Sequence, residues 1–326
     1  MIDFRYHVVS LVAAFLALTV GIVLGGSLFN QPLIDRLGQE REQLAEARDG
    51  LRARIGDLRR DSAYHEAFVS GLAPTLVEGK LEGQTAVVVA LPGAGQELTE
   101  ALRETLRQAG ADISGSLALT GRYVDDSRAG LLDGLVSRLV PAGLTLPEGT
   151  PQQRAAAELA HAVTTKAADD VGKATPERSA ILAGLEEAGF VHVEGEPARG
   201  ATLAAVVAPP GPLQGGRPDE SGAGSGVEVG GADSAVARYN DALVALVGAL
   251  DDAGRGAVLA GPEGAALEDG VVRAVRADPA VGGRTSTVDV AQRASGRVTV
   301  VRALAAELQG RSGHYGMAEG AERPLP

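Results

Sequence analysis

The segment TAVVVALPGAG, residues 85–95, decides the fold class of this chain. Its first seven residues are almost all apolar and rich in valine, and a turn sequence of proline and glycine follows directly. A strand that is apolar on both faces is typical of a parallel sheet covered by helices on both sides. Residues 96–108 then carry leucines four positions apart, which predicts an amphipathic helix that ends near Gly110. The segment therefore predicts the first strand, turn and helix of an α/β domain.

The same alternation of short apolar segments and helical segments continues to residue 310. It predicts an α/β domain over residues 80–310, with a mostly parallel, Rossmann- or flavodoxin-like sheet and helices on both faces. Further strands are expected at residues 113–119, 203–208, 257–260 and 285–290. Further helices are expected at residues 131–139, 151–171, 176–188, 235–250, 265–275 and 296–308. Residues 311–326 are expected to form a flexible tail.

One segment interrupts this pattern. Residues 209–232 contain eight glycines and four prolines and almost no large apolar side chain. Such a segment cannot bury enough apolar surface to offset the entropy lost on ordering. We expect a disordered surface loop, with a functional lid as the alternative.

Near the N-terminus, 21 uncharged residues run from Val8 to Leu28. At about 1.5 Å per residue, a helix of this length spans the roughly 30 Å hydrocarbon core of a bilayer. The segment is longer than the apolar region of a secretory signal, and no A-x-A cleavage site follows it. This favours an uncleaved anchor, residues 1–30, over a cleaved signal. A single arginine in the short N-terminal flank indicates one pass through the cell membrane with the α/β domain on the extracytoplasmic side.

The next segment, residues 31–75, is charged and is expected to continue the helix as a stalk. Its leucines recur every seven residues, and we call these four residues the leucine seam: Leu37, Leu44, Leu51 and Leu58. A heptad repeat predicts a coiled coil, although the second set of core positions is largely polar. Pairing with another helical protein or with a second copy is therefore expected. The alternative is a single amphipathic helix that packs on its own domain. Pro74 is expected to end the helix.

The composition argues against several classes of function. A net charge of −12, without a clustered basic face, argues against nucleic-acid binding. Without cysteine the chain has no disulfide, no thiolate nucleophile and no cysteine metal site. The two methionines are Met1 and Met317, the five histidines show no ligand spacing, and no G-x-S-x-G elbow occurs. We therefore predict no catalytic residues, no cofactor and no metal site.

The turn after the first predicted strand is a weak candidate for binding an anion. Gly93 and Gly95 lie in PGAG, where the N–H groups of a helix N-terminus could face a phosphate. The sequence lacks the third glycine of a dinucleotide fingerprint and the lysine of a Walker motif. A plain tight turn is therefore the favoured interpretation.

Three parts of the chain together resemble a known family. They are the opening MIDFRYHVVSLVAAFLALTVGIVLGGSL, the strand and turn VVVALPGAG, and the terminal SGRVTVVRALAAELQGRSGHYG. Over essentially its whole length the chain resembles the actinobacterial MctB family, which is named for copper transport, and its relative SteB. The family's C-terminal motif corresponds here to Gly313, His314, Tyr315 and Gly316. The resemblance supplies no catalytic residues.

The resemblance implies a role in copper homeostasis or copper transport and in cell-envelope maintenance, through assembly with a membrane partner such as a SteA-like protein. It also implies channels in an outer membrane, since the family was proposed to form them. Such a pore needs a closed barrel of strands about ten residues long, whereas the short apolar strands here alternate with helices. We therefore expect a non-enzymatic membrane-anchored scaffold, with an oligomeric channel-forming copper efflux component as the alternative.

Overall fold

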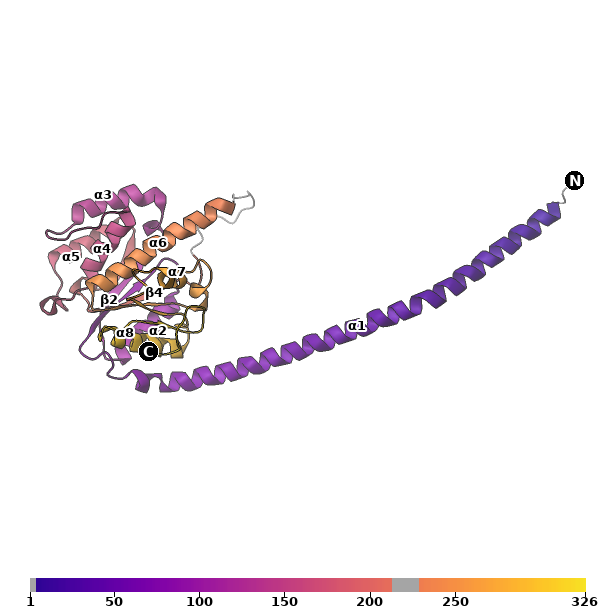
Figure 1. Ribbon diagram of the computed structural model, residues 1–326, viewed down its shortest axis with the longest axis horizontal. Helices are drawn as coiled ribbons and strands as arrows, with labels where there is room; N and C mark the ends of the chain where they lie inside the picture. Colours follow the sequence, from indigo (N-terminus) through magenta and orange to yellow (C-terminus); the bar gives the residue numbers. More distant parts are fainter. Residues whose placement is uncertain (1–3, 213–228) are drawn as a thin grey trace. The chain divides into compact units, whose positions relative to one another are not determined.

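The computed structural model describes residues 4–212 and 229–326, without the side chains of residues 4, 5, 25–40, 42 and 229–233. The chain divides into two compact units, Met1–His65 and Glu66–Pro326. Helix α1, Phe4–Val77, runs through the first unit and ends in the second (Figure 1).

Within the first unit, the segment Tyr6–Leu24 is long and apolar enough to cross a membrane. It has 19 residues and a mean hydropathy of 2.4, and none of it is buried inside the protein. These properties agree with the predicted single-pass anchor that begins at Val8. The predicted end at Leu28 lies among the residues whose side chains are not described.

The stalk is helical throughout, as its sequence predicts, but the helix does not end at Pro74. It continues to Val77, and the N–H of Glu78 donates to the carbonyl of Pro74 at 3.0 Å. Proline has no N–H to donate to the residue four positions earlier, and its ring fits a helix poorly. The helix therefore passes the proline by less than one turn.

The second unit contains a seven-stranded sheet in the order β3-β2-β1-β4-β5-β6-β7. Strand β3 pairs antiparallel with β2, and every other pair is parallel. The strands are β1 Thr85–Ala90, β2 Asp112–Leu119, β3 Val191–Gly195, β4 Leu203–Val207, β5 Ala257–Ala260, β6 Ser286–Val288 and β7 His314–Tyr315. The helices are α2 Gln96–Gln108, α3 Ala129–Leu139, α4 Pro151–Val163, α5 Pro176–Glu187, α6 Val229–Ala253, α7 Val271–Ala277 and α8 Ala294–Glu307. The predicted mostly parallel α/β fold is confirmed.

Helices cover both faces of the sheet, which gives one hydrophobic core on each face. Alternate residues of a single strand point into the two cores. Along β1, Val87 and Val89 belong to the core that residues of α3, α4, α5, α6 and α7 complete, whereas Ala86 and Val88 belong to the core completed by α2, α8 and the end of α1. All four side chains are fully buried. Because neither face of β1 meets water, its sequence is apolar without interruption.

Two predicted helices are shorter than their sequence patterns indicate. The helix expected over residues 151–171 ends at Val163, where Thr164 turns to an extended conformation and bridges to Ala201. The helix expected over residues 265–275 is replaced by a short 3-10 turn and by α7. Between them Gly270 packs so tightly that a methyl group there would lie 2.2 Å from the carbonyl oxygen of Ala265.

Strands β3 and β7 are absent from the sequence prediction. Strand β7 lies within residues 311–326, which the sequence analysis expects to form a flexible tail, so His314 and Tyr315 depart from that expectation. The predicted loop over residues 209–232 also ends early, because α6 begins at Val229. Residues 213–228 of that loop lie outside the described residues.

Candidate functional site

The predicted anion turn has the geometry of an ordinary tight turn. Gly93 has a φ of +78°, and the N–H of Ala94 donates to the carbonyl of Leu91 at 2.9 Å. With proline before the glycine, this is a type II turn, which requires a positive φ at the glycine position. Gly95 is the N-cap of α2 with a φ of −71°, and a methyl group there would meet nothing within 4 Å. The backbone around Gly95 therefore does not need a glycine, so the turn alone explains the sequence.

The C-terminal motif occupies the edge of the sheet beside β6. Strand β7 pairs with β6 in parallel, with His314 opposite Thr287 and Tyr315 opposite Val288. The N–H of Thr287 donates to the carbonyl of Gly313 at 3.1 Å. The motif therefore adds the last strand to the sheet.

A buried carboxylate holds the backbone that follows the motif. Asp289 comes directly after β6 and is fully buried. Its Oδ1 accepts a hydrogen bond from the N–H of Met317 at 2.8 Å, and its Oδ2 accepts one from the N–H of Ala318 at 3.1 Å. Since a buried charge needs both hydrogen bonds and a counter-charge, a cation is expected beside it.

Arg276 on α7 provides that counter-charge. Its Nη2 donates to Oδ2 of Asp289 at 2.9 Å and to the carbonyl of Tyr315 at 3.2 Å. Its Nε donates to the hydroxyl of Thr287 at 2.9 Å, and its Nη1 donates to the carbonyl of Glu319 at 3.3 Å. One guanidinium thus joins α7, β6, β7 and the following turn. We call Arg276, Asp289 and residues 313–316 the C-terminal latch.

The two glycines of the motif are required by close contacts. Gly316 has a φ of +138°, and a methyl group there would lie 1.9 Å from Oδ1 of Asp289. At Gly313 a methyl group would lie 2.7 Å from the hydroxyl of Tyr315. A side chain at either position would push the latch apart.

The two side chains between these glycines are also fixed. Nδ1 of His314 lies 3.1 Å from the hydroxyl of Thr287, and burial together with the charge of Arg276 lowers the pKa of His314. Tyr315 is 1% exposed, burial raises its pKa, and the guanidinium of Arg323 lies 5.9 Å from its ring centroid. No buried side-chain nitrogen or oxygen of the latch lacks a hydrogen-bond partner among the described residues. These polar groups are satisfied by one another, so the latch is arranged to fix the tail rather than to receive a ligand.

Two buried glutamates, which the sequence analysis does not single out, have strongly shifted pKa values. Burial raises the pKa of Glu307 to about 7, although its Oε1 accepts hydrogen bonds from the N–H of Ser286 at 2.9 Å and from its hydroxyl at 2.5 Å. Burial also raises the pKa of Glu158 on α4 to about 7. Glu158 is fully buried and neither of its carboxyl oxygens has a hydrogen-bond partner among the described residues. Within the described part of the chain, no group of three or more metal-ligating side chains could hold a metal ion.

The leucine seam lies on the surface of the stalk. Leu44, Leu51 and Leu58 are 69%, 59% and 67% exposed, and Ile55 beside them is 48% exposed. The side chain of Leu37 is not among those described. Exposed apolar side chains on one side of a helix are a candidate interaction surface, because burying them against a partner lowers the free energy.

Comparison with known proteins assigns the family. The whole chain, residues 1–326, matches the family described as "Copper transport outer membrane protein, MctB". The chain belongs to the MctB family. The copper transporter MctB of Mycobacterium tuberculosis H37Rv and that of Mycobacterium bovis are each 30% identical to it, over 98% of both chains. The copper transporter MctB of Mycobacterium leprae is also 30% identical over 98% of both chains. This MctB-family match includes both the N-terminal anchor and the C-terminal latch.

Proposed function

We propose that this MctB-family protein is a non-enzymatic envelope protein that serves copper homeostasis by assembling with a helical membrane partner along its stalk. The observation that carries the proposal is the exposed leucine seam, in a chain that has one candidate membrane span among its described residues. A stripe of this kind needs a second helix to cover it. The partner is a SteA-like protein or a second copy of this chain, and the α/β domain lies on the extracytoplasmic side.

The residues of the chain support an indirect role in copper handling over direct conduction. Cu(I) prefers thiolate and thioether ligands, whereas the chain has no cysteine and two methionines. The seven strands of the second unit are two to eight residues long and are covered by helices. A membrane barrel would instead present strands of about ten residues to lipid. We therefore assign the copper-related activity to the assembly of this protein with its partner, and not to conduction of copper by this chain.

The test uses two lysines in the seam of the full-length protein, L51K/L58K, expressed in a host that lacks its own copy. Chemical cross-linking in intact cells identifies the partner band, and cellular copper measures function. We expect the double variant to lose the cross-linked partner and to leave the cell with the same altered copper content as a strain without the protein, because charged groups in an apolar seam oppose helix pairing.

A matched variant keeps the added charge but moves it off the seam. Ala53 and Ala63 are exposed. At about 100° per residue, Ala53 lies about 200° around the helix from Leu51, and Ala63 lies about 140° from Leu58. The double variant A53K/A63K should therefore retain the partner and normal copper content. An L51K/L58K protein with an unchanged cross-linked partner and normal cellular copper would refute the proposal.

A further inference from the structure

Arginines border the leucine seam on both sides. At about 100° per residue of helix, five of them lie within about 100° of Leu51. All five are exposed, and we call them the arginine rim: Arg41, Arg48, Arg52, Arg54 and Arg59. Between residues 43 and 60 the acidic residues are Glu46, Asp49 and Asp57, which lie about 120° or more from Leu51. The border of the seam is therefore positively charged, in a chain whose net charge is −12.

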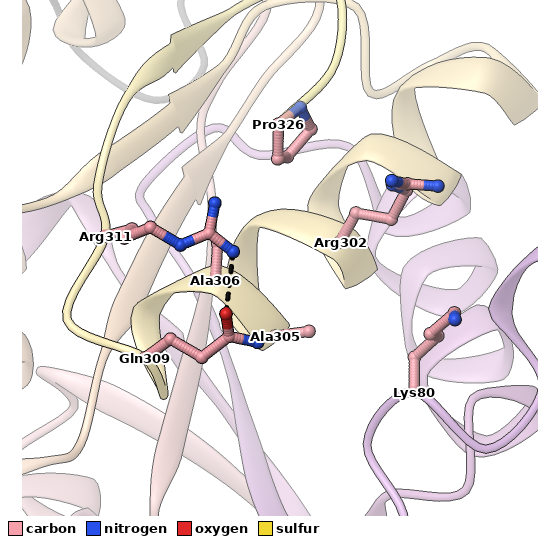
Figure 2. Close-up of a pocket in the computed structure, with 7 residues that line it drawn as sticks. All are labelled: Lys80, Arg302, Ala305, Ala306, Gln309, Arg311 and Pro326. Atoms are coloured by element: carbon pink, nitrogen blue, oxygen red, sulfur yellow. Dashed lines mark hydrogen bonds between the residues drawn. The ribbon is translucent and has the colours of Figure 1, made fainter.

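Basic residues around the pocket beside α8 lack this regular spacing. They come from three separate segments, with Lys80 after α1, Arg302 on α8 and Arg311 after α8 (Figure 2). In the rim, by contrast, four arginines follow one another at steps of seven, four and seven residues, from Arg41 to Arg59. Such steps keep side chains on one side of a helix, so these four share one border of the seam, and Arg54 lies on the other.

The stability of the stalk helix does not explain the rim. Arg48 and Arg52 are four residues apart, a spacing at which like charges destabilise a helix. Oδ1 of Asp49 lies 3.2 Å from Nη2 of Arg48 and 3.6 Å from Nη1 of Arg52, so one carboxylate serves two guanidiniums. The other three arginines of the rim form no ion pair with a described residue. Positive charge thus remains beside the seam for a partner to neutralise.

A second copy of this chain in the same membrane would have to pair in parallel. Helix α1 is continuous from the candidate span Tyr6–Leu24 into the stalk (Figure 1). Two anchored copies therefore leave the membrane at the same depth and in the same direction. In a parallel pair, equivalent heptad positions of the two helices face each other.

Parallel self-pairing brings arginines together in either heptad register. If the seam leucines occupy position d, Arg41 and Arg48 occupy position a, where each meets its own counterpart. In the same register Arg54 at position g meets Arg59 at position e. If the leucines occupy position a, Arg54 and Asp61 occupy position d and each meets its own counterpart. Like charges at these positions oppose pairing, so the chain is a poor partner for itself.

Anionic lipid headgroups are too far away to match the rim. Arg48 follows Leu24 by 24 residues, which is about 36 Å of helix at about 1.5 Å per residue. Salt screens charges over about 8 Å. For a stalk that extends away from the bilayer, the groups that meet the rim therefore belong to a protein.

We propose that the partner is a helix of a different protein whose apolar stripe is bordered by acidic side chains opposite the arginine rim. This assignment rests on the proposed function, because both depend on the leucine seam. Ion pairs along the borders of a coiled coil set the choice of partner, and guanidinium groups bind carboxylates through two parallel hydrogen bonds. The seam supplies apolar contact, and the rim selects an acidic helix over a second copy.

The test pairs the unmodified chain with a defined acidic helix in the same membrane. The acidic chain is the full-length protein with the rim reversed, R41E/R48E/R52E/R54E/R59E. Because the protein has no cysteine, Ala47→Cys beside the seam gives each chain a single site for disulfide cross-linking. The two chains carry different tags and are reconstituted in equal amounts in vesicles of phosphatidylcholine, which has no net charge.

We expect mixed pairs to outnumber pairs of unmodified chains at least about tenfold, against about twofold for random pairing, because only the mixed pair matches opposite charges. Sodium chloride at about 1 M should reduce this excess, since salt screens exposed charges. Pairs of unmodified chains that form as readily as mixed pairs, or a lack of mixed pairs, would overturn the proposal.

Two neighbouring substitutions in the unmodified chain give a matched control. R59E reverses an arginine of the rim, whereas R60E makes the same change of charge at an exposed position about 180° from Leu51. We expect R59E to reduce the mixed pair about fivefold, because an attraction becomes a repulsion, and R60E to leave it unchanged. Equal effects of the two would contradict a selective rim.

The seam variant separates this proposal from the proposed function. If L51K/L58K still forms the mixed pair, the seam is not the contact, and both fail. If L51K/L58K loses all pairing while unmodified chains pair with themselves as readily as with the acidic chain, the stalk is an assembly surface and only the acidic partner is refuted.

Discussion

Arg276 and Asp289 form a buried ion pair of 2.9 Å, with side chains that are 5% and 0% exposed. The pair connects helix α7 to the residue directly after β6. Arg276 also donates to the backbone of the C-terminal motif, and Asp289 accepts from the backbone directly after it. A buried pair is costly to form but more costly to break, because the remaining partner keeps an uncompensated charge. Much of the order of the tail therefore depends on this one contact.

The first prediction concerns the loss of this carboxylate. Asp289→Ala should lower the free energy of unfolding of the α/β domain by about 3–5 kcal/mol, because Arg276 is left buried and unpaired. Urea unfolding followed by the near-ultraviolet circular dichroism of the buried tyrosines measures this. The control is Asp126→Ala, which breaks the exposed pair with Arg238 and should change the value by less than about 1 kcal/mol. Equal effects of the two substitutions would contradict the role given to the buried pair.

The second prediction concerns a glycine of the motif. Gly316→Ala should destabilise the domain by about 2 kcal/mol or more, since the new methyl group would overlap the Asp289 carboxylate at a positive φ. Limited proteolysis should then cut the tail faster. Gly121→Ala is the matched control, because a methyl group there would meet nothing within 4 Å at an ordinary φ. A tail that is equally resistant in both variants would show that the close approach is not required.

The third prediction uses the unpartnered carboxyl of Glu158. Replacing it by methionine, which has a similar length and needs no hydrogen bond, should stabilise the domain by about 1–3 kcal/mol at neutral or higher pH. Urea unfolding measures the gain. Glu187→Met serves as control, because Glu187 is exposed at the end of α5 and its substitution should be nearly neutral. Loss of stability in the Glu158 variant would mean that the carboxyl has a favourable role.

The fourth prediction follows from the raised pKa of the same group. With a folded-state pKa of about 7 against an ordinary value of 4.5, its protonation favours the folded state. This contribution is complete below pH 4.5 and is lost as the pH rises through about 7. The unmodified domain should therefore lose stability over this range, and E158M should lose less. Because Glu307 acts in the same direction, the difference between the two pH profiles isolates Glu158. Identical profiles would contradict the prediction.

The fifth prediction tests the anchor and the channel alternative together. Deletion of residues 1–30 should move the protein from the carbonate-resistant membrane fraction to the soluble fraction, since Tyr6–Leu24 is the candidate span of the described chain. The full-length protein should show no single-channel conductance in planar bilayers. A conductance that selects cations, and that persists after the deletion, would contradict the scaffold function.

The sequence predicts those elements best whose apolar residues follow a clear pattern, either an uninterrupted apolar strand or a helix with one apolar face. Helix α2 and strand β5 have their predicted bounds, and strand β1 ends one residue before its predicted end. Strand β3 is different, because it lies at the edge of the sheet, where His192 and Glu194 alternate with two valines. An apolar segment is not required at an edge, so this strand has no strong sequence signal.

The latch could be located from the sequence but not explained by it. The motif residues 313–316 are apparent there, whereas Arg276 and Asp289 are single charged residues in separate segments. Their partnership depends on α7 crossing the end of β6, which is a tertiary contact without a periodic pattern. The burial of Glu158 is equally invisible in the sequence, because it depends on how α4 packs against α3, α5 and α6.

The contact between Thr287 and His314 makes the state of the tail observable by spectroscopy. The threonine hydroxyl already accepts a hydrogen bond from Nε of Arg276, so one further lone pair and one proton remain for the imidazole. While β7 is paired, His314 should titrate below the ordinary histidine range, and it should return to that range when β7 separates from β6. The nitrogen chemical shifts of this one ring would therefore report, in a membrane sample at a chosen pH, the fraction of molecules in which the sheet edge is closed.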